Sequence, residues 1–138
     1  MPKVDAEAAN KLYSAVAEVI KKDIPSSMIA PALGGIAVAL ARSAMAGRLG
    51  VDVDLSKVPH VSGMSAAEIL FSESNSRFII TCRPEKSAAL EKALAGFTFA
   101  KVGKTDASGV LNVRGEGVAL SLKLEDMLRS YKGTLAGV

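Results

Sequence analysis

The sequence predicts a single mixed α+β domain, and three observations favour this class. Helical periodicity is concentrated early in the chain, whereas short strand-like segments and turns fill the later part. That order is typical of α+β folds rather than of a doubly wound parallel sheet. The length of 138 residues suits one domain with one core. Apolar residues make up 49% of the chain and aromatic residues only 4%, so we expect an aliphatic core.

Two helices are expected near the start of the chain. Over residues 6–22 one apolar stripe follows helical spacing, and Asp5 can cap its first turn. The members of the stripe are Ala8, Leu12, Ala15, Val16, Val19 and Ile20. The second helix, over residues 34–46, is apolar on nearly every face, which indicates burial on most sides. Between them we expect a turn over residues 23–27, and Pro31 bars a regular helix over 28–33.

The remaining elements are short, and turn residues separate them. In order, we expect a strand over 51–55, a loop over 56–64, a helical turn over 65–71, a strand over 77–83, a helix over 84–94, a strand over 97–103, a turn over 106–109, strands over 110–113 and 118–122 joined by a turn at 115–117, and a helix over 124–131. The spacing of Ser65 and Glu68 matches a capping box.

Composition argues against several classes of function. The net charge of +3 is spread along the chain without a basic run, so we expect no nucleic-acid binding. One cysteine excludes an intrachain disulfide and a multi-cysteine metal site. The N-terminus has no apolar core of a signal peptide, and the apolar stretch over residues 28–41 is too short and interrupted to span a membrane. We therefore expect a soluble, cytoplasmic chain with no membrane contact.

Gly34 and Gly35 form the first candidate site, because they precede the second predicted helix. Backbone N–H groups at a helix start can bind phosphate, but no P-loop lysine or complete dinucleotide motif accompanies this pair. The alternative is a tight entry into the helix that only glycine permits. The sequence leaves both interpretations open.

The second candidate is the polar segment over residues 72–77, directly before an apolar strand. Glu73 could bind a metal or a ribose hydroxyl, and Arg77 could bind phosphate. Ser74 and Asn75 share the same loop. The alternative is a turn that starts the strand and contains a structural Glu73–Arg77 pair.

No other residues assemble into a catalytic or metal-binding set. His60 has no nearby ligand partner and is expected to be exposed, and Cys82 is expected to be a buried, inert thiol. Asp52 and Asp54 share one side of a predicted strand, which we interpret as its solvent face. We therefore assign no catalytic residue and no metal ligand.

Several segments, in order along nearly the whole chain, resemble the last domain of the synthetase component of formylglycinamide ribonucleotide amidotransferases. The segments are GGIAVAL at 34–40, AMAGRLG at 44–50, VDVDL at 51–55, LFSESNSRF at 70–78, FAKVG at 99–103 and the closing segment at 124–135. The resemblance implies a three-layer α/β/α domain of the aminoimidazole ribonucleotide synthetase C-terminal type, partly ferredoxin-like. It also implies that residues 1–138 are one domain of a longer chain.

The resemblance implies a parent enzyme that uses ATP and Mg²⁺ to convert formylglycinamide ribonucleotide to its amidine in purine biosynthesis. The ammonia would come from a glutaminase domain or subunit. The family's catalytic and nucleotide-binding residues lie in upstream synthetase domains, so the resemblance implies no cofactor bound by this chain and no activity of the chain alone. The alternatives are a stand-alone interaction module, or the same domain of a hydrogenase maturation protein or a selenophosphate synthetase. The FSES run at 71–74 argues against these sister enzymes.

The resemblance also gives the polar loop a more particular interpretation. Glu73, Ser74, Asn75 and Arg77 resemble the duplicated copy of a substrate-binding Glu-Ser-Gln-x-x-Arg string, which would lie near an auxiliary nucleotide site in some members. Residues 27–35 keep the family's glycines but lack the histidine and acids that usually precede them. We therefore expect the segment over residues 28–40 to pack on a neighbouring domain or subunit, and to promote self-association of this chain alone.

Overall fold

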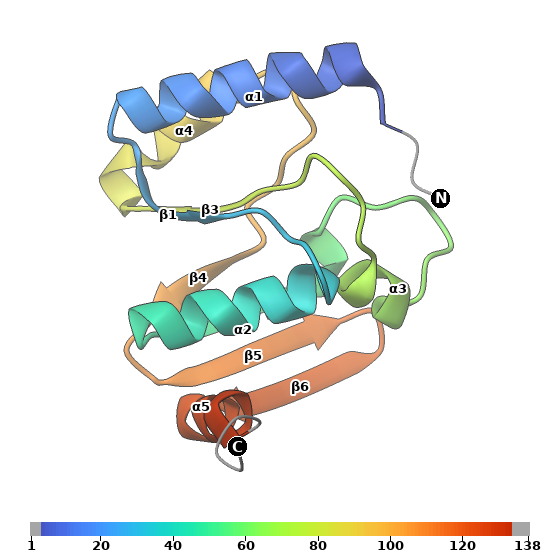
Figure 1. Ribbon diagram of the computed structural model, residues 1–138, viewed down its shortest axis with the longest axis vertical. Coiled ribbons are helices and arrows are strands. Elements are labelled where there is room, and N and C mark those ends of the chain that lie inside the picture. The colour runs from blue at the N-terminus through green and yellow to red at the C-terminus, as the bar shows by residue number, and fades with distance from the viewer. Residues whose placement is uncertain (1–3, 134–138) are drawn as a thin grey trace.

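The computed structural model describes residues 4–133 and shows the mixed α+β domain that the sequence predicts (Figure 1). Its elements are, in order, α1 (Ala6–Lys21), β1 (Pro25–Ile29), α2 (Gly35–Gly47), β2 (Gly50–Asp54), η1 (Leu55–Lys57), α3 (Ala66–Phe71), β3 (Ile79–Cys82), η2 (Pro84–Lys86), α4 (Ser87–Ala93), β4 (Gly103–Asp106), β5 (Val110–Gly115), β6 (Val118–Lys123) and α5 (Leu124–Gly133). The end of the closing segment, at 134–135, lies outside the described residues.

The larger sheet has four strands in the order β4-β2-β5-β6. β2 and β5 are parallel, and the two outer pairs are antiparallel. Side chains alternate between the faces of a strand, so Val51 and Val53 turn toward the core while Asp52 turns away. Leu55 and Ile69 are among the most completely buried side chains of this core, and each contributes about 1.5–3 kcal/mol through burial.

A smaller unit pairs β1 with β3 in antiparallel register. Figure 1 shows α1 and α4 side by side on one side of this strand pair, with α2 on the other side. A second cluster of buried residues joins the unit: Val19 of α1, Ile24 and Leu94. The 72–78 segment runs from the α2–α3 region to this smaller unit, so it connects the two parts of the domain.

One turn prediction and one strand prediction differ from the structure, and tertiary contacts explain both. The turn expected over 23–27 is present only at its start, because residues 25–27 already belong to β1. β1 pairs with β3 more than fifty residues away through backbone bonds and a 2.6 Å hydrogen bond between Ser27 Oγ and Thr81 Oγ1. The strand expected over 97–103 is irregular up to Val102, and β4 follows it and includes Asp106. A Cβ on Gly103 would collide with the carbonyl oxygen of Asp52, so the close pairing of β4 with β2 begins at a glycine.

Most of the apolar stripe predicted for α1 is confirmed, since Val16 and Val19 are buried and Leu12 and Ala15 are half-buried. Ala9, Val16 and Val19 are buried, whereas Ala8 is exposed and Ile20 remains 57% exposed. The Asp5 cap is confirmed, because its carboxylate accepts hydrogen bonds from the N–H groups of the first turn. Only the two end members of the stripe differ from the prediction, and at the first turn the alanines at 8 and 9 have the same hydrophobicity, so composition does not distinguish them.

Candidate functional site

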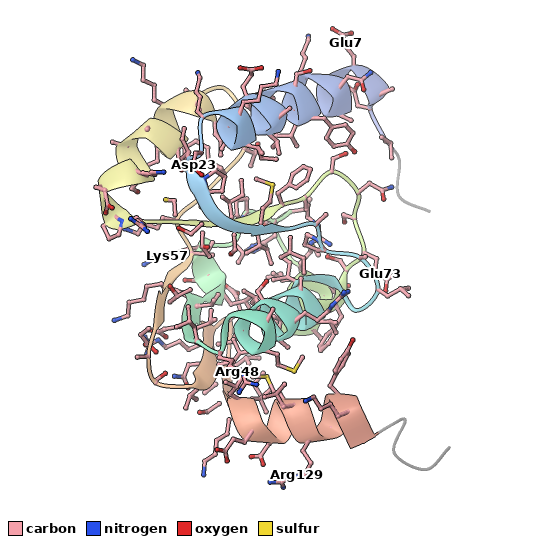
Figure 2. The ribbon with its side chains drawn as sticks, turned by 60° about the vertical axis from the view of Figure 1, so that its left-hand side comes forward. Glu7, Asp23, Arg48, Lys57, Glu73 and Arg129 are labelled. Carbon is pink, nitrogen blue, oxygen red and sulfur yellow. The ribbon has the colours of Figure 1, made fainter. Side chains whose placement is uncertain are left out.

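The structure brings the two candidate segments of the sequence together. The backbone N–H of Gly34 donates a 2.8 Å hydrogen bond to the carboxylate of Glu73, 39 residues away. Figure 2 shows Glu73 at the end of the molecule where α2 begins. A carboxylate at this position is favourable because the first N–H groups of a helix have no partner within it and carry partial positive charge. Glu73 therefore occupies the place of an anion at the N-terminus of α2.

The glycine pair has a steric reason of its own. Gly34 and Gly35 have φ angles of +80° and +62°, in the left-handed region that glycine adopts without strain. A Cβ on Gly35 would lie 2.6 Å from the carbonyl oxygen of Leu70 and 2.7 Å from that of Ser72. These close contacts require a glycine at the entry of the helix, and they pack the start of α2 directly on the end of α3.

Arg77 closes the loop on itself. Its Nε donates to the carbonyl oxygen of Ser74 at 3.1 Å, its Nη1 donates to Ser72 Oγ at 3.2 Å, and its Nη2 donates to the carbonyl oxygen of Ser72. Burial lowers the pKa of Arg77 from its usual value because it penalises the charged guanidinium. Glu73 and Arg77 bind different partners, so the structural Glu73–Arg77 pair that the sequence suggested is not formed.

The other end of the loop contacts α1. The hydroxyl of Tyr13 lies 2.8 Å from Ser76 Oγ, and its ring meets Phe78 edge-on at a centroid distance of 6.0 Å. Ser74 and Asn75 are exposed at the tip of the loop. Sequence reasoning missed the role of Tyr13, because no local pattern indicates a partner 63 residues away.

A largely apolar cavity of about 540 Å³ lies beside the loop, between α1 and the four-stranded part of the domain. Its walls include Leu12, Val16, Ile36 and Leu40, and the loop contributes Asn75 and Arg77 to its polar part. The guanidinium of Arg77 is the cationic group at this cavity, but three of its five N–H groups already serve the loop. The geometry favours a structural use of the loop's charges.

The remaining candidates fall outside this site. His60 is exposed, as predicted, with its Nδ1 2.6 Å from the carbonyl oxygen of Val58. Cys82 is a free thiol that is only half-buried, so the expectation of a buried thiol is wrong. Asp52 and Asp54 share a face as predicted, but Asp52 is only 19% exposed and forms a 2.7 Å ion pair with Arg114.

Within residues 4–133 there is no group of three potential metal ligands, and no helix is long and apolar enough to cross a membrane.

Comparison with known families identifies the class of this domain. Residues 1–116 match the family described as AIR synthase related protein, C-terminal domain, and the chain belongs to this family. The resemblance seen in the sequence is therefore confirmed.

Among similar proteins, the phosphoribosylformylglycinamidine synthase subunit PurL of Methanocaldococcus jannaschii is 33% identical over 132 residues, which is 95% of this chain and 18% of the relative. PurL of Thermococcus sibiricus is 38% identical over 104 residues, which is 75% of this chain and 14% of that relative. The chain thus spans less than a fifth of the length of these relatives.

Solved structures show the same fold. The phosphoribosylformylglycinamidine synthase II of Thermotoga maritima superposes with a TM-score of 0.80 at 22% identity, over 92% of this chain and 22% of that one. The PurLQS structure from the same organism gives a TM-score of 0.80 at 22% identity, over 91% and 22% of the two chains.

Proposed function

We propose that this chain is the C-terminal, largely structural domain of a phosphoribosylformylglycinamidine synthase. This enzyme is the ATP-dependent ligase that converts formylglycinamide ribonucleotide to its amidine with glutamine-derived ammonia. The homology with PurL over 95% of the chain supports the enzyme class. The observation that carries the structural role is the hydrogen bond from Gly34 to Glu73, because it uses the loop's carboxylate to fasten α2.

In this proposal, the catalytic reaction takes place in the other domains and subunits of the parent enzyme. The coverage of 18% of the Methanocaldococcus relative supports the proposal that residues 1–138 are one domain of a longer synthetase. Thermotoga maritima PurL has been solved in complex with ATP and with ADP, which supports ATP as a cofactor of the parent enzyme, and we propose Mg²⁺ as its companion. The PurLQS structure supports partners for the parent enzyme, and we propose other synthetase domains and a glutaminase domain or subunit among them. We propose a cytoplasmic location for this assembly, and no phosphate release by the 138-residue chain alone.

Replacement of Glu73 tests the structural role. Glu73→Ala removes the acceptor for the Gly34 N–H, so it should lower the melting temperature of the chain and the yield of folded complete synthetase. Glu73→Gln keeps a side-chain oxygen acceptor and should recover most of the loss. In both variants, kcat per folded complete synthetase should stay near that of the parent. A selective loss of kcat at an unchanged melting temperature would show that Glu73 contacts substrate instead.

The apolar surface next to this loop supports a packing role for the segment over residues 28–40. Leu33 is 82% exposed, Phe71 is 56% exposed, and both lie beside the glycine turn. Side chains of this size rarely stay exposed together unless a partner covers them. In the chain alone we expect self-association, measured by sedimentation velocity, that Leu33→Asp weakens. Ile20→Asp, on the distant end of α1, is the matched control, and a strictly monomeric chain at high concentration would contradict the proposal.

A further inference from the structure

A second hollow, of about 360 Å³, lies on the polar side of the four-stranded sheet. Six charged side chains line it: Asp52, Asp54, Lys57, Lys101, Lys104 and Arg114. Figure 2 shows Lys57 on the opposite side of the molecule from Glu73, so this hollow is separate from the loop described above. The proposed function gives these residues no role.

The two carboxylates of the hollow are already neutralised. Arg114 Nη2 lies 2.7 Å from Asp52 Oδ2, and Lys57 Nζ lies 3.3 Å from Asp54 Oδ2. The pKa of Asp54 is lowered, first by the hydrogen bond from the Ser56 hydroxyl and then by contacts that include Lys57, so this carboxylate is ionised at neutral pH. Neither carboxylate retains an unbalanced negative charge that would repel an anion.

Two lysines remain available. Within residues 4–133, Lys101 and Lys104 form neither a hydrogen bond nor an ion pair with another side chain. Lys104 acts only at longer range on Asp106, whose pKa is lowered mainly by hydrogen bonds from Ser108. Four cations and two carboxylates therefore leave two positive charges around the hollow.

The backbone fixes where these lysines stand. β4 can approach β2 closely because a side chain at Gly103 would collide with the Asp52 carbonyl oxygen, and glycine has none. This approach places Lys104 directly opposite Asp52 in the ladder, and Lys101 just before the strand. Asp52 Oδ1 is buried without a hydrogen-bond partner, so an intrachain contact with Lys104 is the competing use of that ammonium group.

We propose that this hollow binds a phosphate group. A phosphate monoester carries a charge of about −1.5 to −2 at neutral pH, which matches the two unbalanced positive charges of the lining. A phosphate also has three oxygens that can meet several ammonium groups at once, whereas a carboxylate brings a single charge. Lysine binds phosphate as a point charge, and the volume of the hollow is that of a small-ligand site. The phosphate could belong to a nucleotide or be inorganic phosphate.

Calorimetric and NMR titrations of the 138-residue chain at low salt would test this site with inorganic phosphate, AMP and adenosine. Phosphate and AMP should bind saturably and shift backbone signals of residues 101–104, whereas adenosine should not. The Lys101→Gln/Lys104→Gln double variant should bind roughly tenfold more weakly, on the scale of two exposed charge interactions. Lys92→Gln/Lys132→Gln removes the same charge elsewhere and should leave binding unchanged.

The comparison of ligands identifies the source of the phosphate. AMP binding that is much tighter than phosphate binding indicates a nucleotide, and equal affinities indicate inorganic phosphate; both outcomes support the site. The proposal is overturned if phosphate does not bind saturably, or if both double variants weaken binding equally. The first result would show that the hollow is not a phosphate site, and the second would indicate a general effect of net charge.

Discussion

The substitution Gly35→Ala tests whether the start of α2 is fixed by direct contact with the end of α3. The new Cβ would lie 2.6 Å from the carbonyl oxygen of Leu70, 2.7 Å from that of Ser72 and 2.8 Å from the carbonyl carbon of Phe71. All three are backbone atoms, so no side-chain rotation can relieve the contact. The residue also has a φ of +62°, where an L side chain is strained.

The expected decrease in the free energy of unfolding combines two destabilising contributions and one stabilising contribution. An alanine in the left-handed region costs about 1–2 kcal/mol, and overpacking against a fixed neighbour costs about 1–3 kcal/mol. Alanine also restricts the unfolded chain, which returns about 0.4–1 kcal/mol. The net decrease in the free energy of unfolding should be about 3 kcal/mol. For a domain of this length, that decrease lowers the melting temperature by roughly 10 °C.

Gly63→Ala is the matched control, because Gly63 has a φ of +88° but no heavy atom within 4 Å of the position that the new methyl group would occupy. It should lose only the conformational part, about 1 kcal/mol. Urea denaturation followed by circular dichroism measures both variants. Equal losses at positions 35 and 63 would refute the reasoning, because the contact with α3 would then contribute nothing.

Three further predictions concern the core, a helix cap and the contact between α1 and the loop. Leu55→Ala should lower the free energy of unfolding by about 2–5 kcal/mol in urea denaturation, because Leu55 is completely buried. Hydrogen bonds from the N–H and the hydroxyl of Ser65 lower the pKa of Glu68, so the stability that they contribute is present above pH 4.5 and is lost as the pH falls through the folded-state pKa. The melting temperature of the chain should therefore exceed that of Glu68→Gln at pH 7, and this difference should shrink in acid; a constant difference would contradict the assignment. Tyr13→Phe should lower the melting temperature less than Tyr13→Ala, because phenylalanine loses only the hydrogen bond to Ser76 and keeps the ring contact.

The helices could be predicted well because their signals are local. Asp5 caps α1, and the spacing of Ser65 and Glu68 forms the reciprocal capping box that starts α3. α2 was recognised by its apolar composition, although Val38 is exposed and the helix is less enclosed than predicted. Periodicity and caps depend on residues within a few positions, and sequence reasoning can evaluate such patterns directly.

The two strands that the sequence analysis did not predict, β1 and β4, depend on partners far along the chain. β1 has the sequence PSSMI, in which a proline and two serines suggest a turn, yet it becomes a strand by pairing with β3. β4 has the sequence GKTD, is exposed throughout, and exists because β2 offers it an edge. Neither segment has the alternating apolar pattern of an independent strand, so only the tertiary fold determines its conformation.

In the candidate site, too, the local features could be predicted and the long-range contacts could not. Gly34, Gly35 and the 72–77 loop were each identified from the sequence, but their contact was not, because the Gly34–Glu73 bond spans 39 residues. Lys101 and Lys104 were missed for the same reason. They become part of a basic cluster only because the fold places Lys57 and Arg114, from other elements, around the same hollow. The residue types in the sequence indicated which segments carry polar side chains, and the topology determined which of these side chains contact one another.

The hydrogen-bond partners of the 72–78 loop show how its polar groups are used within the fold. A charged group whose hydrogen bonds are already used within the chain must break them before it can use the same donors or acceptors for a ligand. Here the carboxylate of Glu73 holds the start of α2, and the guanidinium of Arg77 holds the carbonyl oxygens of Ser72 and Ser74. Ser76 is held by Tyr13 of α1. The loop thus connects α1, α2 and α3 through its polar side chains, and this use of its charges is the basis of the structural role proposed above.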